Sequence, residues 1–213
     1  MKDVVVVFAR APRLGAVKRR LAYGVGQRVA LRFHMSTLIG LLRGLLADRR
    51  FRTVLALTPD RARFRLPRGI EQVERVWQGG GDLGARMHRA FRQFPRVRVA
   101  LIGCDIPDAG PQDALAAFRA LGTADAAFGP ATDGGYWLVA MSPRRPARPF
   151  ASVRWSTPHA LADTLANFKG RRIALLRTLH DVDTAEDLGR VIRSAGRVRR
   201  AARRVARDPA ALR

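Results

Sequence analysis

The chain has 213 residues, 47% of them hydrophobic, so it can bury one sizeable core but not the cores of two full domains. It contains no run of about 18 to 20 uninterrupted apolar residues, and its opening apolar run, 4–9, is shorter than a signal peptide, so we expect a cytoplasmic protein without a membrane span. The net charge of +23 would attract phosphorylated ligands, but the basic residues are spread along the chain without a recognised nucleic-acid motif, so we expect no specific nucleic-acid binding.

A first strand over residues 4–8 is followed by a glycine-containing basic loop. Every residue of this strand is apolar, which is typical of a central parallel strand that is covered on both faces. In the loop, Gly15 permits close approach of the backbone, and Lys18 and Arg20 offer charge-assisted contacts to a diphosphate or triphosphate. Because basic loops are common in so basic a chain, a loop without such a role is the alternative.

Leucines at spacings of three and four predict a helix over about 27–49 that packs on a sheet. Strands over 52–58 and 70–77 follow, and the second of them leads into a glycine cluster, 79–81. Gln78, the glycine amides and Asp82 could meet the sugar or base of a nucleotide. An ordinary loop with Asp82 as the N-cap of the next helix explains the same residues.

The apolar run 97–102 ends in Gly103, Asp105 and Pro107, as expected for a buried strand that emerges at the edge of a sheet. Ligands of open α/β sheets bind at this edge, and a carboxylate there can hold Mg²⁺ on a phosphorylated substrate. Alternatively, Asp105 begins a turn or caps the helix predicted over 112–121. The chain's single cysteine, Cys104, lies within the buried pattern, which favours a core residue over a nucleophile.

In the second half, a strand over 125–128 and a strand over 138–141 flank an Asp-Gly-Gly turn. The turn is an ordinary hairpin signal, but it could also project Asp133 and the amides of Gly134 and Gly135 over the pocket of an acceptor. Ser156 or Thr157 is expected to cap a helix that runs to residue 168, and the last strand is expected over 173–176.

Asp181 and Asp183 precede a predicted capping box formed by Thr184 and Asp187. Alternating acids in a loop can share a metal ion, although favourable charge at a helix start would also explain them. We divide the chain into one domain, 1–193, and a basic helical tail, 194–213. Arginines in 197–207 make a solvated face the plain interpretation of this tail, and contact with RNA or a membrane surface the alternative.

Taken together, the motifs resemble the DUF2064 family of bacterial glycosyltransferase-like proteins, which includes the arsenosugar-biosynthesis glycosyltransferase group. Six motifs, occurring in the same order from about Val4 to Leu188, carry the resemblance. They are Phe8-Ala9-Arg10-Ala11-Pro12 with Gly15, Val17-Lys18 and Arg20-Leu21; Gln78 with Asp82-Leu83-Gly84 and Arg86-Met87; Gly103 with Asp105 and Pro107; Gly129-Pro130-Ala131 with Asp133-Gly134-Gly135-Tyr136; Trp155-Ser156-Thr157; and Asp181-Val182-Asp183-Thr184 with Asp187-Leu188. Arg19 stands where the family pattern leads us to expect threonine, and Ala85 where it leads us to expect an acid.

The resemblance implies an α/β fold with a three-layer, Rossmann-like mixed sheet, the nucleotide-diphospho-sugar transferase or glycosyltransferase-A fold. It also implies kinship with phospholactate guanylyltransferase and the molybdenum-cofactor nucleotidyltransferases. It implies Asp105 as a ligand of Mg²⁺ or Mn²⁺, with Asp181 or Asp183 as the second ligand. The nucleotide- and substrate-binding residues that we expect on this basis are Ala9, Arg10, Pro12, Gly15, Lys18, Arg20, Gln78, Gly81, Asp82, Gly84, Gly134, Gly135 and Tyr136.

We therefore expect a metal-dependent glycosyltransferase that moves a sugar from a nucleoside diphosphate sugar to a small acceptor. Asp105, Asp133 and Lys18 are its expected catalytic residues. The principal alternative is a nucleotidyltransferase that joins a nucleoside triphosphate to a phosphorylated small molecule and releases pyrophosphate. A lesser alternative is a non-catalytic binder of nucleic acids or anionic surfaces. The oligomeric state stays open.

Overall fold

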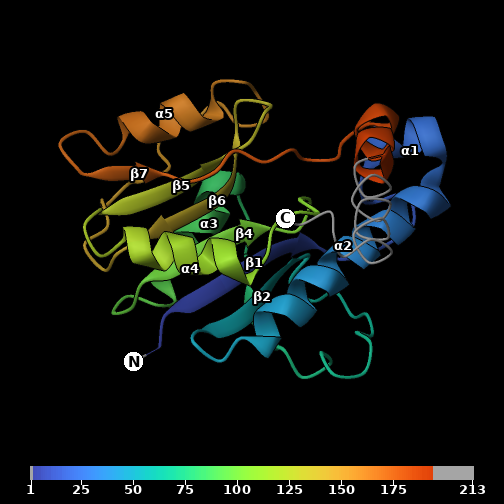
Figure 1. The fold of residues 1–213 in the computed structure, drawn as a ribbon, viewed down its shortest axis with the longest axis horizontal. Helices are drawn as coiled ribbons and strands as arrows, with labels where there is room; N and C mark the ends of the chain where they lie inside the picture. The colour runs from blue at the N-terminus through green and yellow to red at the C-terminus, as the bar shows by residue number, and fades with distance from the viewer. Residues whose placement is uncertain (1, 194–213) are drawn as a thin grey trace, which may run out of the picture.

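The computed structural model describes residues 2–193, and these form one mixed seven-stranded sheet in the order β3-β2-β1-β4-β6-β5-β7 (Figure 1). The tail predicted over 194–213, with its arginines in 197–207, lies outside the described residues. The strands are β1 (Val4–Arg10), β2 (Arg52–Thr58), β3 (Glu74–Trp77), β4 (Val99–Gly103), β5 (Ala126–Pro130), β6 (Tyr136–Met141) and β7 (Ile173–Leu175). Strand β6 runs antiparallel to both of its neighbours, and the other pairings are parallel.

Helices cover both faces of the sheet, which confirms the three-layer α/β architecture. They are α1 (Arg19–Val25), α2 (Gln27–Ala47), α3 (Leu83–Arg92), α4 (Pro111–Ala120) and α5 (Ala160–Ala166), and residues 185–193 are also helical. Helices α2 and α4 contribute to the core on one face of the sheet, and α3 and α5 pack on the other. A third, small core joins α1, the start of α2 and the helix over 185–193, which lie side by side in Figure 1.

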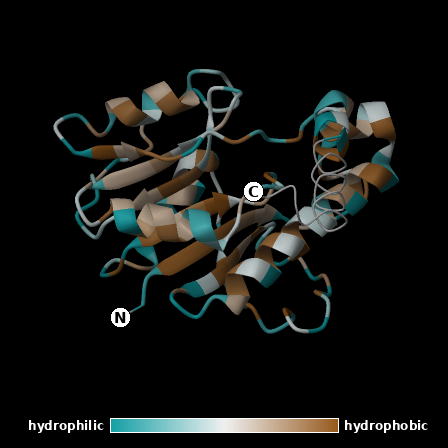
Figure 2. Cartoon of the chain, in the orientation of Figure 1, coloured by the Kyte–Doolittle hydropathy of each residue, from teal (hydrophilic) through white to brown (hydrophobic). Residues whose placement is uncertain are grey.

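The alternation of side chains along β1 feeds both large cores. Val5, Val7 and Ala9 face the layer of α2 and α4, whereas Val6 and Phe8 face the layer of α3 and α5. Both sets are buried, and Figure 2 shows the hydrophobic colour concentrated on the strands at the centre of the molecule. A central strand with two covered faces must be apolar throughout, which is why β1 carries no polar side chain before Arg10.

The pairing of β1 with β4 sets the position of the candidate site. These strands are parallel neighbours, with Phe8 opposite Gly103. Arg10 and Asp105 each follow two residues later, so both emerge at the same edge of the sheet. This is the carboxyl edge, where open α/β sheets bind their ligands.

Three predicted elements differ from the structure. Strand β3 begins at Glu74 rather than at residue 70, because Ile70 lies in a turn in which its carbonyl accepts a hydrogen bond from the amide of Val73. Helix α5 begins at Ala160, because Thr157 accepts a hydrogen bond from the amide of His159 and donates one to a backbone carbonyl, which builds a turn instead of a cap. Helix α1 was not predicted, and its first residues fall in the expected basic loop.

Among the described helices, only α2 is long and apolar enough for its length and composition to match a membrane span. One side of α2 packs against the sheet through leucines that include Leu38, Leu42 and Leu45. The exposed positions of the helix carry Arg28, Arg32 and Arg43. A core helix passes the same test of length and composition, and the buried leucines of α2 give it that role.

Asp82 caps α3, which is the alternative to a nucleotide contact, and its carboxylate accepts a hydrogen bond of 2.8 Å from the amide of Ala85. Asp82→Ala should lower the free energy of unfolding by about 1 kcal/mol, because one amide of the first turn loses its acceptor. Urea unfolding at neutral pH measures this loss. Glu71→Ala, at an exposed acid in a turn, is the matched control and should change stability by less than about 0.5 kcal/mol.

Candidate functional site

A cleft of about 420 Å³ opens at the carboxyl edge of the sheet. Strands β1 and β4 supply Arg10 and, just beyond the strand end, Asp105. The β5–β6 hairpin supplies Asp133, and the segment before the last helix supplies Asp181 and Asp183. The acids that the sequence placed at a common site, one from mid-chain and two from near residue 180, therefore line the same cleft.

Lys18 links two of these acids. Its Nζ atom donates a hydrogen bond of 2.8 Å to Oδ1 of Asp183 and lies 3.4 Å from Oδ2 of Asp105. The lysine side chain is only 5% exposed, whereas the two carboxylates are 41% and 48% exposed. Burial would lower the pKa of Lys18, but the charges of Asp105 and Asp183 outweigh it and raise the pKa. Lys18 is thus a fixed cation beneath two carboxylates.

Asp105 is held in its ionised form. Partial burial would raise its pKa, but His34 and the charge of Lys18 outweigh this effect and hold the pKa at about 2. Oδ1 of Asp105 faces Nδ1 of His34 at 3.7 Å, and Oδ2 faces Lys18. The other nitrogen of His34, Nε2, lies 2.9 Å from the carbonyl oxygen of Arg10. His34 therefore bridges the ends of β1 and β4.

The wall of the cleft that contains Asp133, Asp181 and Asp183 carries negative charge. Burial, followed by the charges of Asp133 and Asp183, raises the pKa of Asp181. Among the described residues, no basic side chain lies within 4.0 Å of Asp181. Four carboxylates thus line a cleft whose lining also carries Arg10 and Arg86, and beneath which Lys18 pairs with two of the acids. Asp133 and Asp181 form no ion pair with a described side chain, so a bound divalent cation would offset the negative charge around them, and carboxylate oxygens are suitable ligands for it.

The end of β1 and the start of α1 bring exposed cations to the rim of the cleft. The side chain of Arg10 reaches the carbonyl of Ala16, and Arg20, 77% exposed, lies 4.0 Å from Asp183. Gly15 adopts a φ of +74°, a conformation in which a side chain would be strained. Both arginines are exposed and held only by these long contacts, so an anion from solvent can reach them, whereas Lys18 is buried in its ion pairs.

Gln78 has a structural role that the sequence did not reveal. Its side chain is buried, and Nε2 donates hydrogen bonds to the carbonyls of Ala9 and Ala56 at 3.1 and 2.7 Å. Its Oε1 accepts a hydrogen bond from Arg86. Gln78 thus ties together the ends of β1, β2 and β3, although it also lines the cleft. A nucleoside that contacts Gln78 would have to share these bonds.

The expected glycines divide by role. Gly81 has a φ of +94° next to the cap of α3, where its conformation is required. A Cβ atom on Gly84 would lie 2.9 Å from Trp155, and one on Gly134 would lie 2.2 Å from the backbone of Pro158. Gly84 and Gly134 are therefore needed for close packing. Gly135 lines the cleft, and its amide donates a hydrogen bond to Asp133.

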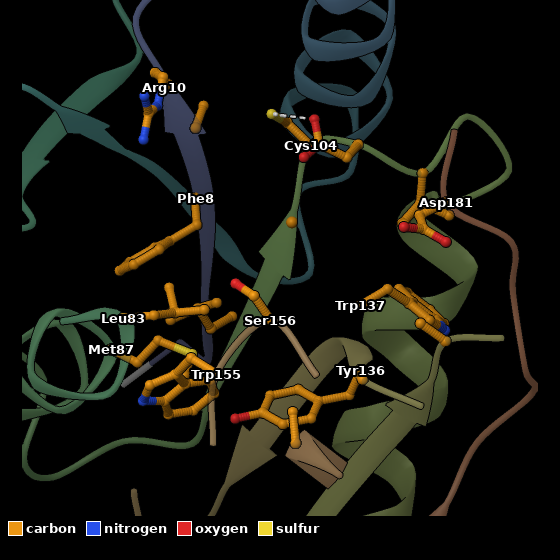
Figure 3. A pocket seen from close by; sticks show the side chains of 18 of the residues that line it. Phe8, Arg10, Leu83, Met87, Cys104, Tyr136, Trp137, Trp155, Ser156 and Asp181 are labelled. Carbon is orange, nitrogen blue, oxygen red and sulfur yellow. Dashed lines mark hydrogen bonds between the residues drawn. The ribbon is translucent and has the colours of Figure 1, made fainter. Parts of the chain in front are cut away.

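One side of the cleft is apolar. Figure 3 shows Phe8, Leu83, Met87 and Trp155 gathered on this side, with Cys104 and Asp181 on the other. Tyr136 lies edge-on to Trp155, with ring centroids 6.4 Å apart. The cleft thus joins a charged half, suited to phosphates and a cation, to an apolar half that can hold an uncharged group.

Residues 41–157 match the model of DUF2064, a family described as "Uncharacterized protein conserved in bacteria". The match covers more than half of the chain. This chain belongs to the DUF2064 family. No curated protein matches its sequence.

Solved structures extend the comparison to most of this DUF2064 chain. A protein of Desulfovibrio desulfuricans G20, described as a nucleotide-diphospho-sugar transferase, is 29% identical, with a TM-score of 0.79 over 91% of this chain and 88% of that one. Rv0371c of Mycobacterium tuberculosis H37Rv, in complex with manganese, is 17% identical, with a TM-score of 0.52 over 91% and 100%. A 4-diphosphocytidyl-2C-methyl-D-erythritol synthase of Anaerococcus prevotii DSM 20548 is 10% identical, with a TM-score of 0.56 over 87% and 94%. The last two show the fold alone, which is the nucleotide-diphospho-sugar transferase fold.

Sequence reasoning missed two features of the DUF2064 site. His34 lies on the buried face of α2, where a histidine between leucines is a weak signal, and only the structure brings it to Asp105. Trp155 is the second: it packs against Phe150, as a partly buried aromatic ordinarily does, but it also lines the cleft. Ser156, next to it, has a φ of +61°, which is uncommon for a residue other than glycine. This strained turn holds the Trp155 segment against the cleft.

Proposed function

We propose that this DUF2064 protein is a metal-dependent transferase that moves a sugar from a nucleoside diphosphate sugar to a small acceptor. The observation that carries the proposal is the position of Asp105. Its carboxylate lies just beyond the end of the central strand β4 and lines a cleft whose rim carries arginines. The Desulfovibrio relative, described as a nucleotide-diphospho-sugar transferase, supports the same class of donor. We further propose that the protein acts in the cytoplasm, where nucleotide sugars are made.

The residues of the cleft fit a divalent cation, Mg²⁺ or Mn²⁺. Asp105 would hold it, because among the described residues its carboxylate lies within 4.8 Å of two other possible ligands, His34 and Cys104. Asp181 and Asp183 line the same cleft but belong to no such group, so they would contribute if their loop moved toward Asp105 and the ion pair of Asp183 with Lys18 loosened. When bound, the cation would stabilise the negative charge that develops on the leaving diphosphate. The manganese complex of Rv0371c is a structure of this fold with such an ion.

The chain's own residues would position the donor. Arg10 and Arg20 would contact its phosphates from the rim, and the backbone at Gly15 would allow a phosphate to approach closely. Lys18 would act indirectly in this arrangement, because it holds Asp105 and Asp183 in place. The glycine loop with Gly81 would lie along the nucleoside.

Asp133 would orient or deprotonate the acceptor hydroxyl. It lies in the β5–β6 turn, is exposed, and lines the cleft. The apolar half of the cleft would hold the body of the acceptor against Trp155, Leu83 and Met87, because burial of apolar surface there is favourable. Tyr136 would support Trp155 from the hairpin side.

Trp155→Ala should raise the KM for the acceptor about tenfold and leave the KM for the donor within about twofold. The indole supplies apolar contact area that alanine lacks. Initial rates with each substrate varied in turn measure both constants. The control is Trp77→Ala, at a tryptophan that is 69% exposed on the edge strand β3 and outside the cleft. Equal changes in both constants would place Trp155 outside the acceptor subsite.

A nucleotidyltransferase is the second candidate. The exposed arginines at the rim of the cleft favour it, because they could hold a triphosphate as well as a diphosphate.

The first experiment is a thermal-shift screen of nucleotides and nucleotide sugars with and without Mn²⁺, since a bound ligand raises apparent stability. Product analysis then separates the candidates. Free nucleoside diphosphate supports glycosyl transfer, and pyrophosphate supports nucleotidyl transfer. Strong RNA or DNA binding with a steep salt dependence, in a protein that forms neither product, would instead favour the binder.

A further inference from the structure

The Nδ1 atom of His34 is a buried polar atom without a hydrogen-bond partner. It is the only side-chain atom of this kind among residues 2–193. The His34 side chain is 3% exposed and lies on the sheet-facing side of α2. An unpartnered polar atom in a protein interior costs free energy, and such atoms are rare enough to require an explanation.

The environment of the ring determines what Nδ1 offers. The Nε2 atom lies 2.9 Å from the carbonyl oxygen of Arg10, and a carbonyl oxygen can only accept a hydrogen bond. Nε2 therefore carries a hydrogen, and Nδ1 is the ring nitrogen that faces Asp105. It lies 3.7 Å from Oδ1 of Asp105, which is too long for a good hydrogen bond. The two atoms thus face each other across a gap, and a positive charge there, on the ring or on a bound ion, would stabilise the ionised carboxylate.

The gap has the dimensions of a shared cation site. Nitrogen and oxygen ligand atoms lie roughly 2.1 Å from divalent ions such as Mg²⁺, Mn²⁺ and Zn²⁺. One ion can therefore bind two ligand atoms that are up to about 4.2 Å apart. The separation of 3.7 Å lies within this limit. The second oxygen of Asp105 is occupied by Lys18, whereas Oδ1 accepts a weak hydrogen bond of 3.7 Å from the Cys104 thiol. Oδ1 is therefore the oxygen that an ion can take more easily.

We propose that His34 Nδ1 and Asp105 Oδ1 are joint ligands of the divalent cation in this cleft. The inference rests on the proposed function for the presence of a metal and goes beyond it by adding a nitrogen ligand. Imidazole is a poor ligand for Mg²⁺, which prefers oxygen, and a better one for transition metals. The site should therefore bind Mn²⁺ more tightly than Mg²⁺, and Co²⁺ more tightly than Mn²⁺.

The test measures metal binding directly, without substrate. Isothermal titration with MnCl₂ and with MgCl₂ is performed on the wild type and on His34→Leu, and pulsed electron paramagnetic resonance of bound Mn²⁺ detects coupling to a nitrogen ligand. We expect the wild type to show this coupling and to favour Mn²⁺. We expect His34→Leu to lose the coupling and at least tenfold in Mn²⁺ affinity, with Mg²⁺ affinity changed less than about threefold.

The control variant is His180→Leu, which removes an exposed histidine next to Asp181 whose Nδ1 atom lies 3.1 Å from the hydroxyl of Thr132. This variant should keep the nitrogen coupling and the Mn²⁺ affinity. If His34→Leu does not fold, wild-type protein labelled with ¹⁵N-histidine answers the same question, because the label changes the coupling pattern only when histidine binds the ion.

Three results would overturn the proposal: no nitrogen coupling in the wild type, equal losses of Mn²⁺ and Mg²⁺ affinity in His34→Leu, or loss of the coupling in His180→Leu. None of them depends on turnover. A protein that binds Mn²⁺ through His34 but transfers no sugar would refute the proposed function alone, and a transferase without the nitrogen coupling would refute this inference alone.

Discussion

Asp105→Asn is expected to lower kcat for transfer by about 10²- to 10³-fold while the protein stays folded. The substitution keeps the size of the side chain but removes the charge that faces Lys18 and His34 at the end of β4. Electrostatic groups that stabilise a developing charge typically account for losses of this size. Steady-state rates of nucleoside diphosphate release, measured with saturating donor and acceptor, test this expectation.

Asp108→Asn is the matched control, because this exposed acid lies three residues farther along the same loop. It should retain activity within about twofold. Thermal unfolding of both variants shows whether each is folded at the assay temperature. Full activity in folded Asp105→Asn would remove the basis of the transferase proposal.

Lys18→Met should lower the free energy of unfolding by about 2 kcal/mol at neutral pH. Removing one partner of a fully buried ion pair costs about 3 to 5 kcal/mol, because the other charge is left uncompensated. The cost here should be smaller, because the two carboxylates are nearly half exposed and water screens them. Methionine retains the apolar stem of the lysine. Urea unfolding measures the loss, and Lys169→Met, at an exposed lysine, is the control.

The penalty of Lys18→Met should also depend on pH. The pKa of Asp105 is about 2 in the folded protein, below its ordinary value of 3.8, so its ion pair contributes stability above pH 4 that is lost as the pH falls toward 2. The difference between wild type and Lys18→Met should therefore shrink in this acidic range. The pKa of Lys18 is raised, so its contribution persists up to its ordinary pKa of 10.5 and is lost only above it. A penalty that stays constant between pH 5 and pH 2 would contradict the pairing with Asp105.

The sequence predicted the fold well because its signals were local. The apolar run of β1 reflects burial on two faces, and the leucine spacing of α2 reflects burial on one face. Both elements appear nearly as expected. Asp105 was located because parallel strands share a carboxyl edge. Short elements were less predictable: α1 has seven residues, and its start at a left-handed Lys18 carries no conventional cap.

The sequence could not reveal which groups would pair in the cleft. Lys18 and Asp183 are 165 residues apart, so nothing local indicates that the lysine meets this acid instead of solvent. Gln78 was expected at a nucleoside, but the structure commits its amide to two strand ends. Such partners depend on long-range packing, which a sequence pattern on a single element does not contain.

The small core around Val182 has a consequence for how the protein is made. Val182 lies between Asp181 and Asp183 in the chain. It is fully buried and packs with Leu21 and Ala30. A ribosome releases the central strands well before it has synthesised this valine. The nascent chain can therefore assemble strands β1 to β6 while the charged half of the cleft is still unfinished, and the cleft is completed only after the segment around Val182 has been synthesised.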